Sequence, residues 1–258
     1  MSGANVAAAG SVVSGANVAA AGNVVSGANV PAAGNVVSGA EFTAMLLADA
    51  RLPTGGHAHS AGVEPAVLGG LAPGRVRELM IGRAVTASRV EAGAAVVARH
   101  VLVSGSGALA QVAAEWAART PAPAQRDASA ELGRGYLRLG RSLWPSSPHL
   151  ADAGRLDRPY RPLILGAIAA ESGLPATDLA RLVIYDEAAG AAAALLKLEP
   201  GDPAEATGWI LDACAASEPL LGELAALTDP VAIPASGAPQ TEEWAQAHTT
   251  RDRRLFRA

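Results

Sequence analysis

The sequence predicts an all-α protein with a single helical-bundle domain. Half of its 258 residues are hydrophobic but only 3% are aromatic, and alanine, leucine and valine carry most of the apolar weight. Alanine is the best helix former, whereas a sheet would require more isoleucine, tyrosine, phenylalanine and threonine. From Phe42 onward, apolar residues recur every three to four positions, as in helices with one buried face. A chain of this length can bury a substantial core.

The individual helices follow from this period and from residues that start helices. Apolar residues at helical spacing predict helices over 75–101, 124–143, 160–171, 177–198 and 203–227. Before the last of these, Asp202 is a typical N-cap, Pro203 suits the first turn, and Glu205 follows at the third position. Thr177 is expected to cap the preceding helix. Together these elements place the bundle domain at residues 41–228.

Residues 1–40 form a low-complexity segment of near-identical twelve-residue repeats, at 2–13, 14–25 and 26–37. A weaker period of six within each repeat is compatible with a parallel β-helix, but the segment supplies only about two turns, too few to bury a core. Glycine and asparagine disfavour a helix, and the segment has no charged or aromatic residue between positions 2 and 40. We therefore expect residues 1–40 to be disordered.

Charge and cysteine content restrict the class of protein. The formal net charge of −4 argues against a nucleic-acid-binding protein. Cys214 is the only cysteine, so no internal disulfide forms, and we expect it to be buried on a helix rather than reactive. After residue 40 no uncharged apolar run is long enough to span a membrane, and the N-terminus does not resemble a secretion signal. The sequence therefore indicates a cytoplasmic protein.

The lysine content argues against nucleotide hydrolysis. Lys197 is the only lysine among the 20 lysine and arginine residues, and no glycine-rich loop precedes it. A P-loop requires a lysine after such a loop, because its ammonium group binds the β- and γ-phosphates. Schiff-base chemistry also depends on a suitably placed lysine. We expect a protein with no catalytic residues and no cofactor.

The stretch from Pro53 to Glu64 predicts a corner between two helices. Pro53 ends the first helix, and Gly55 with its neighbouring glycine allows backbone angles that other residues avoid. Ser60 or a neighbour is expected to open the next helix, with Glu64 near its positive N-terminal end. A glycine-rich loop of this kind is either a structural corner or a surface that another protein approaches closely.

Two histidines in this loop, His57 and His59, are weak candidates for a metal site. Histidines two positions apart can share a metal ion, but no third ligand lies at a supporting spacing. The surrounding residues 58–62 also resemble part of a serine-hydrolase nucleophile elbow, although the strand that should precede it is missing. We therefore predict neither a dedicated metal site nor a hydrolase.

The C-terminal segment, residues 241–258, differs from the body of the protein. Four arginines flank two apolar residues, Leu255 and Phe256, after a linker rich in proline and glycine at 229–240. Such a basic segment with apolar anchors is a common way to dock on another protein, and a frayed terminus is the alternative. On the helix at 124–143, Arg134 shares a face with other charged residues, which favours a solvated face or a partner contact.

Three of these stretches resemble the UreF family of urease accessory proteins, over about residues 43–258. The first is the loop, in which Pro53, Gly55, Ser60, Gly62 and Glu64 match recurrent family positions. The second is Arg119-Thr120-Pro121, followed by Gly133-Arg134 and Trp144-Pro145. The third is the end of the chain, where His248 precedes Arg254-Leu255-Phe256. The chain departs from the family in ending with Ala258 rather than serine, and in having histidines where many members have aromatic residues.

The resemblance implies an all-α homodimer that binds the accessory protein UreD/UreH and recruits the GTPase UreG. This assembly would insert nickel into apo-urease, with the C-terminal segment becoming ordered when UreD/UreH binds. The resemblance assigns partner binding to one set of residues: Pro53, Gly55, Ser60, Glu64, Arg134, His248, Arg254, Leu255 and Phe256. Two alternatives stay open at this point, a nickel carrier that uses His57 and His59, and a helical interaction protein unrelated to urease.

Overall fold

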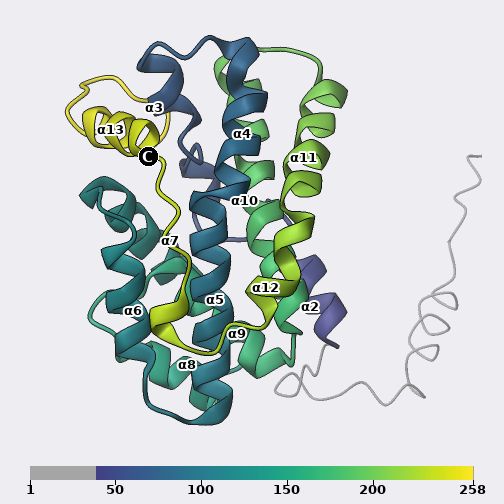
Figure 1. Ribbon diagram of the computed structural model, residues 1–258, viewed down its shortest axis with the longest axis vertical. Helices are drawn as coiled ribbons and strands as arrows, with labels where there is room; N and C mark the ends of the chain where they lie inside the picture. The colour runs from purple at the N-terminus through teal and green to yellow at the C-terminus, as the bar shows by residue number, and fades with distance from the viewer. Residues whose placement is uncertain (1–38, 258) are drawn as a thin grey trace, which may run out of the picture. The chain divides into compact units, whose positions relative to one another are not determined.

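The structure, a computed structural model, describes residues 39–257, and every regular element in that range is helical (Figure 1). The prediction of an all-α fold is thereby confirmed. The α-helices are α2 (Ala40–Leu47), α3 (Val63–Leu68), α4 (Val76–Val85), α5 (Ala87–Ser104), α6 (Leu109–Ala118), α7 (Pro123–Leu143), α8 (Pro148–Ala153), α9 (Arg161–Ser172), α10 (Ala176–Leu198), α11 (Pro203–Ser217), α12 (Leu221–Ala225) and α13 (Pro239–His248). The repeats predicted to be disordered lie outside the described residues, apart from Gly39 and Ala40. No helix in the described range is both long and apolar enough to cross a membrane.

The centre of the bundle is the packing of α5 against α9 and α10 (Figure 1). The side chains on these facing surfaces are aliphatic and fully buried, among them Val97, Leu163, Ile164, Ile168, Leu179 and Val183. Gly166 lets α5 and α9 approach closely, because a Cβ atom there would lie 2.6 Å from the carbonyl oxygen of Ala95. The abundance of alanine and glycine therefore gives a close-packed helical core with few aromatic side chains.

The helix predicted at 75–101 is in fact two helices, α4 and α5. The chain leaves helical geometry at Thr86, which has φ −120° and ψ −93°. Its hydroxyl donates a 2.7 Å hydrogen bond to the carbonyl oxygen of Gly82, a local bond that competes with the helical ladder. The apolar spacing on the two sides of the break is continuous, so periodicity alone did not reveal it.

Helix starts and stops differ from the prediction at two further points. α10 begins at Ala176 after Pro175, so Thr177 lies inside the first turn and does not cap the helix. The segment after Pro203 is interrupted, because Pro219 lies in a 3-10 turn over Glu218–Leu220 between α11 and α12. The predicted cap at Asp202 is confirmed, since its carboxylate accepts a 2.8 Å hydrogen bond from the amide of Ala204.

The predicted linker, residues 229–240, lies against the bundle. Arg119, directly after α6, donates 2.8 Å hydrogen bonds to the carbonyl oxygens of Val231 and Ile233. Ile233 is buried, and a Cβ atom at Gly93 on α5 would lie 2.7 Å from Pro234. The linker thus carries α13 across the bundle to α3. Cys214 is half-buried on α11, and burial raises the pKa of its thiol.

Candidate partner-docking site

The loop from Pro53 to Glu64 folds as the corner that its glycines predict. Gly55 has φ +89° and Gly62 has φ +83°, in the left-handed region that favours glycine. A 3-10 turn lies between them, and α3 starts directly after Gly62. The hydroxyl of Ser60 accepts a 3.3 Å hydrogen bond from the amide of Glu64, so Ser60 supports the first turn of α3. Both side chains are buried.

The carboxylate of Glu64 holds the end of the chain. Its Oε1 atom accepts a 2.6 Å hydrogen bond from the amide of Leu255, and its Oε2 atom accepts a 2.8 Å bond from the amide of Phe256. Nε2 of His248 lies 3.1 Å from the same Oε2 atom, where the imidazole donates because a carboxylate only accepts. Burial lowers the pKa of His248 and outweighs the opposing effect of Glu64.

We call residues 239–257, which are α13 and the tail after it, the C-terminal cover (Figure 1). Beyond Glu64, the tail binds the loop and α3 through their main chain. The amide of Arg257 donates to the carbonyl oxygen of Ala58 at 2.8 Å, and the guanidinium of Arg251 donates to that of Leu68 at 2.9 Å. Phe256 is buried under the ammonium group of Lys197, which lies 5.3 Å from its ring centre. These contacts bring together two stretches that lie about 190 residues apart in the sequence.

The cover also contacts α7, which carries Arg134. Arg257 forms an ion pair with Glu131, and Gln246 accepts a 3.2 Å hydrogen bond from the amide of Ala124. A groove of about 300 Å³ runs between the two segments, with Arg134 on its wall. α7 can approach the loop because of its glycines: a Cβ atom at Gly135 would lie 2.0 Å from the carbonyl oxygen of Thr54.

The structure divides the predicted partner residues into two groups. Four of them are buried and hold the loop and cover together: Ser60, Glu64, His248 and Phe256. The others lie at or near the surface around this junction: Pro53, Gly55, Arg134, Arg254 and Leu255. Leu255 is 61% exposed although its amide is bound by Glu64. The buried group therefore fixes the backbone, and the exposed group presents side chains.

The two loop histidines differ in environment. His57 is exposed, whereas His59 is partly buried and its Nδ1 atom has no hydrogen-bond partner. Burial, followed by the positive charge of Arg257, lowers the pKa of His59 to about 4, so its imidazole is neutral at pH 7. Among residues 39–257, no group of three or more histidine, cysteine, aspartate or glutamate side chains is arranged to hold a metal ion.

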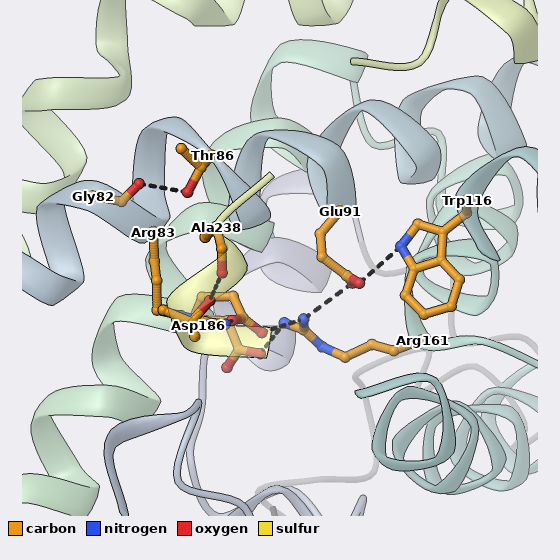
Figure 2. Close-up of polar contacts among 10 residues, drawn as sticks. Gly82, Arg83, Thr86, Glu91, Trp116, Arg161, Asp186 and Ala238 are labelled. Carbon is orange, nitrogen blue, oxygen red and sulfur yellow. Dashed lines mark hydrogen bonds and ion pairs between the residues drawn. The ribbon is translucent and has the colours of Figure 1, made fainter. Parts of the chain in front are cut away.

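Beneath the loop lies a cluster of charges that sequence analysis did not identify. We call it the interior charge cluster, and it consists of Arg83, Glu91, Arg161, Asp186 and Glu187 (Figure 2). The guanidinium of Arg161 contacts Asp186 at 2.6 Å and Glu187 at 2.8 Å, and Arg83 contacts Glu187 at 2.8 Å. Burial opposes the ionisation of Glu187, but Arg161 and Arg83 together outweigh it and lower its pKa. The only sequence signal was the acidic pair Asp186-Glu187 near the middle of the largely apolar α10.

Glu91 is the least satisfied member of the interior charge cluster. Its Oε1 atom accepts a 2.9 Å hydrogen bond from the indole of Trp116, as Figure 2 shows. Its Oε2 atom is buried without a hydrogen-bond partner, 3.6 Å from the guanidinium of Arg161. Burial raises the pKa of Glu91 to about 7, although Arg161 acts in the opposite direction. This carboxyl group therefore titrates close to neutral pH.

The chain matches one protein-family model and several curated proteins of the same name. The family model described as UreF matches residues 74–214. Among curated proteins, the "Urease accessory protein UreF" of Mycobacterium sp. strain JLS is 40% identical over 225 residues, covering 83% of this chain and 97% of the relative. The proteins of that name from Mycobacterium marinum and Mycobacterium tuberculosis are 38% and 35% identical, each covering 82% of this chain and 96% of the relative.

Proposed function

The chain belongs to the UreF family of urease accessory proteins, and from this premise we propose that it is a cytoplasmic adaptor that binds UreD/UreH and recruits the GTPase UreG. The resulting assembly inserts nickel into apo-urease. A urease accessory protein serves the maturation of another enzyme and is not an enzyme itself. Family membership also excludes the alternative of a helical interaction protein unrelated to urease.

The observation that carries this proposal is the position of Leu255. Its amide is fixed by the buried Glu64 carboxylate, while 61% of the residue is open to solvent beside the exposed Arg254. An apolar side chain presented by an immobilised backbone loses little conformational entropy on binding, and arginine beside it adds charge-assisted hydrogen bonds. The loop and the cover thus form one composite surface for UreD/UreH.

The composite surface is tested by co-purification with UreD/UreH. We expect Leu255→Ser to weaken binding about tenfold, because a central apolar anchor is lost. Val231→Ser is the matched control, since Val231 is 59% exposed on the linker, away from the loop. Deleting residues 241–258 should abolish binding while the helical circular dichroism stays, because the bundle core lies almost entirely outside this segment. Full binding by either altered chain would overturn the proposal.

Nucleotide hydrolysis in this scheme belongs to UreG. The only lysine, Lys197, lies near the end of α10 with its ammonium group over Phe256, which is a packing role. The adaptor therefore supplies surfaces and its partner supplies the chemistry. Purified chain alone should not hydrolyse GTP, and turnover by the isolated protein would contradict this division.

We place the homodimer contact on the face formed by α2, α10 and α11. An apolar groove of about 670 Å³ lies there, lined in part by Met45 and Tyr185, which are 69% and 39% exposed. Exposed apolar patches of this kind on soluble proteins commonly mark interfaces. Met45→Glu should convert a dimer into a monomer in light scattering, whereas Val231→Glu should not. A wild-type monomer would contradict the assignment.

A nickel carrier is the second candidate, because the free Nδ1 atom of His59 is a neutral nitrogen ligand. Calorimetric titration with nickel separates it from the adaptor. Tight binding that disappears in the double variant His57→Ala, His59→Ala would favour the carrier. The adaptor predicts that this variant retains UreD/UreH binding and that its nickel affinity resembles that of the wild type.

A further inference from the structure

The C-terminal cover forms part of the wall of a partly open cavity that contains ionisable groups. The cavity has a volume of about 120 Å³, and its walls come from α4, α5, α6, α7, α9, α10 and the loop. The cover and linker contribute Ser236, Glu242 and Ala245. On the opposite wall lie Glu91, Arg161 and Glu187 of the interior charge cluster. The cluster and the cover therefore face the same cavity.

The interior charge cluster has one more carboxylate than it has cations. Arg83 and Arg161 supply two positive charges, whereas Glu91, Asp186 and Glu187 supply three negative charges if all are ionised. Arg161 is closer to Asp186 and Glu187 than to Glu91, whose Oε2 atom has no hydrogen-bond donor. A proton on Glu91 balances the charges, and its loss leaves one uncompensated negative charge on a mostly buried side chain.

The remaining groups around the cavity do not correct this imbalance. Arg119, directly after α6, is already paired with Glu115. His59 is neutral at pH 7 because its pKa is about 4. Glu242, on the cover itself, adds a further carboxylate to the cavity wall. Glu91 interacts with Arg83, Trp116, Arg161 and Glu187. The other charged or titratable groups on the cavity wall or in the cluster are His59, Arg119, Asp186 and Glu242.

We propose that Glu91 makes the docking of the C-terminal cover sensitive to pH. The cover is closed when Glu91 holds a proton, and it loosens when Glu91 ionises, because lifting the cover admits water to the charge. The direction follows from linkage: a carboxyl group that binds its proton more tightly in the closed form favours closing at low pH. Its contribution declines as the pH rises from about 4.5 toward the closed-form pKa of about 7.

This sensitivity has a consequence that rests on the proposed function. Hydrolysis of urea releases ammonia, a base, so an active urease raises the surrounding pH. The adaptor would then lose its closed cover as urease activity accumulates, which slows further maturation. The experiments on the cover described next do not involve urease, so they test the pH sensitivity independently of the adaptor role.

The direct test compares hydrogen exchange of residues 239–257 in wild type and Glu91→Gln at pH 6, 7 and 8, corrected for intrinsic exchange. The glutamine keeps an acceptor for Trp116 but cannot ionise. The ratio of wild-type to variant protection should fall about tenfold from pH 6 to pH 8. Using the ratio removes the contributions of His59 and His248, which both chains share. A constant ratio would overturn the proposal.

A control variant and a second measurement distinguish this result from an effect of misfolding. Glu78→Gln alters an exposed glutamate paired with Arg75. The ratio of wild-type to Glu78→Gln protection at residues 239–257 should therefore stay constant with pH. If Glu91→Gln fails to fold, the reciprocal measurement uses carboxyl NMR titration of Glu91 in wild type and in Glu64→Ala. Opening the cover should lower the pKa of Glu91 toward its ordinary value, and an unchanged pKa would refute the coupling.

Discussion

The packing of α5, α9 and α10 buries mostly apolar side chains, whereas the C-terminal cover is attached largely through hydrogen bonds, three of them to the Glu64 carboxylate. The first region buries Leu163, Ile164 and Ile168 completely. The second buries Phe256 and relies further on polar contacts, those of Glu64 with His248 and two main-chain amides and those of Arg251, Gln246 and Arg257. The two regions therefore differ in the kind of interaction that stabilises them, although they belong to one compact set of helices.

The difference has a functional meaning. Apolar burial is non-directional and involves no ionisation, so the apolar part of the bundle core keeps its packing over a wide range of conditions. Hydrogen bonds to a buried carboxylate fail together when that carboxylate is lost, because each remaining donor is left without a partner. The bundle thus acts as a permanent scaffold, and the cover is a part whose docking can respond to partners and to pH.

The largest loss of stability is expected from a cavity in the bundle core. Ile168→Ala removes a fully buried side chain between α9 and its neighbours and should lower the free energy of unfolding by about 3–4 kcal/mol. Chemical denaturation measures this loss. Val231→Ala, at a 59% exposed position, should change stability by less than about 0.5 kcal/mol. A similar cost at both positions would show that the bundle is not the stable region.

Removing the Glu64 carboxylate, which accepts three hydrogen bonds from the cover, should loosen the cover and leave the bundle folded. Glu64→Ala leaves His248 and the amides of Leu255 and Phe256 without their acceptor, which weakens docking by about 2–3 kcal/mol. Trypsin should then cut after Arg251 and the neighbouring arginines at least about tenfold faster.

Glu64→Gln retains one acceptor oxygen and should give an intermediate rate in the same proteolysis assay. Global denaturation of both variants should show a loss no larger than this docking free energy, because the rest of the bundle core is untouched. Cleavage at the wild-type rate in Glu64→Ala would mean that the cover is held by other contacts.

A pH effect of comparable or smaller size is expected at Glu91. Its pKa is raised from 4.5 to about 7, so its contribution to stability is full below pH 4.5 and is lost as the pH rises to 7. Relative to wild type, Glu91→Gln should therefore gain at most about 3 kcal/mol in unfolding free energy between pH 4.5 and pH 8. Urea denaturation at several pH values measures the gain, and parallel curves for the two chains would contradict it.

The smallest effect is expected at the surface. Arg75 and Glu78 form an ion pair in which both side chains are at least 60% exposed. Solvent screening reduces the value of such pairs, so Glu78→Gln should change the free energy of unfolding by less than about 0.5 kcal/mol. A change above about 1 kcal/mol, measured by denaturation at low salt, would show that surface charge matters more here than assumed.

The sequence predicted the scaffold well because helix period and capping are local signals. The cap at Asp202 and the corner before Glu64 both depend on residues a few positions apart. Local signals failed where a single side chain interrupts a regular pattern, as Thr86 does between α4 and α5. Periodicity reports which residues are apolar, and it does not report where the backbone leaves helical geometry.

The candidate site was only half visible in the sequence. Glu64, His248 and Phe256 were singled out by family resemblance as partner contacts, but no local pattern indicates that they bind one another across the chain. Arg161 and Glu91 were missed for the same reason, since their partners lie on other helices. Contacts between distant segments require the fold, because charge and spacing do not identify which side chains meet.

Amide exchange at Leu255 and Phe256 measures directly whether Glu64 docks the tail. In the wild-type chain at pH 6, both amides should exchange slowly, because each donates to the buried carboxylate. In Glu64→Ala they should exchange at nearly the rate of an unstructured peptide. Fast exchange of both amides in the wild type would contradict the account, because the tail would then be undocked in the isolated protein.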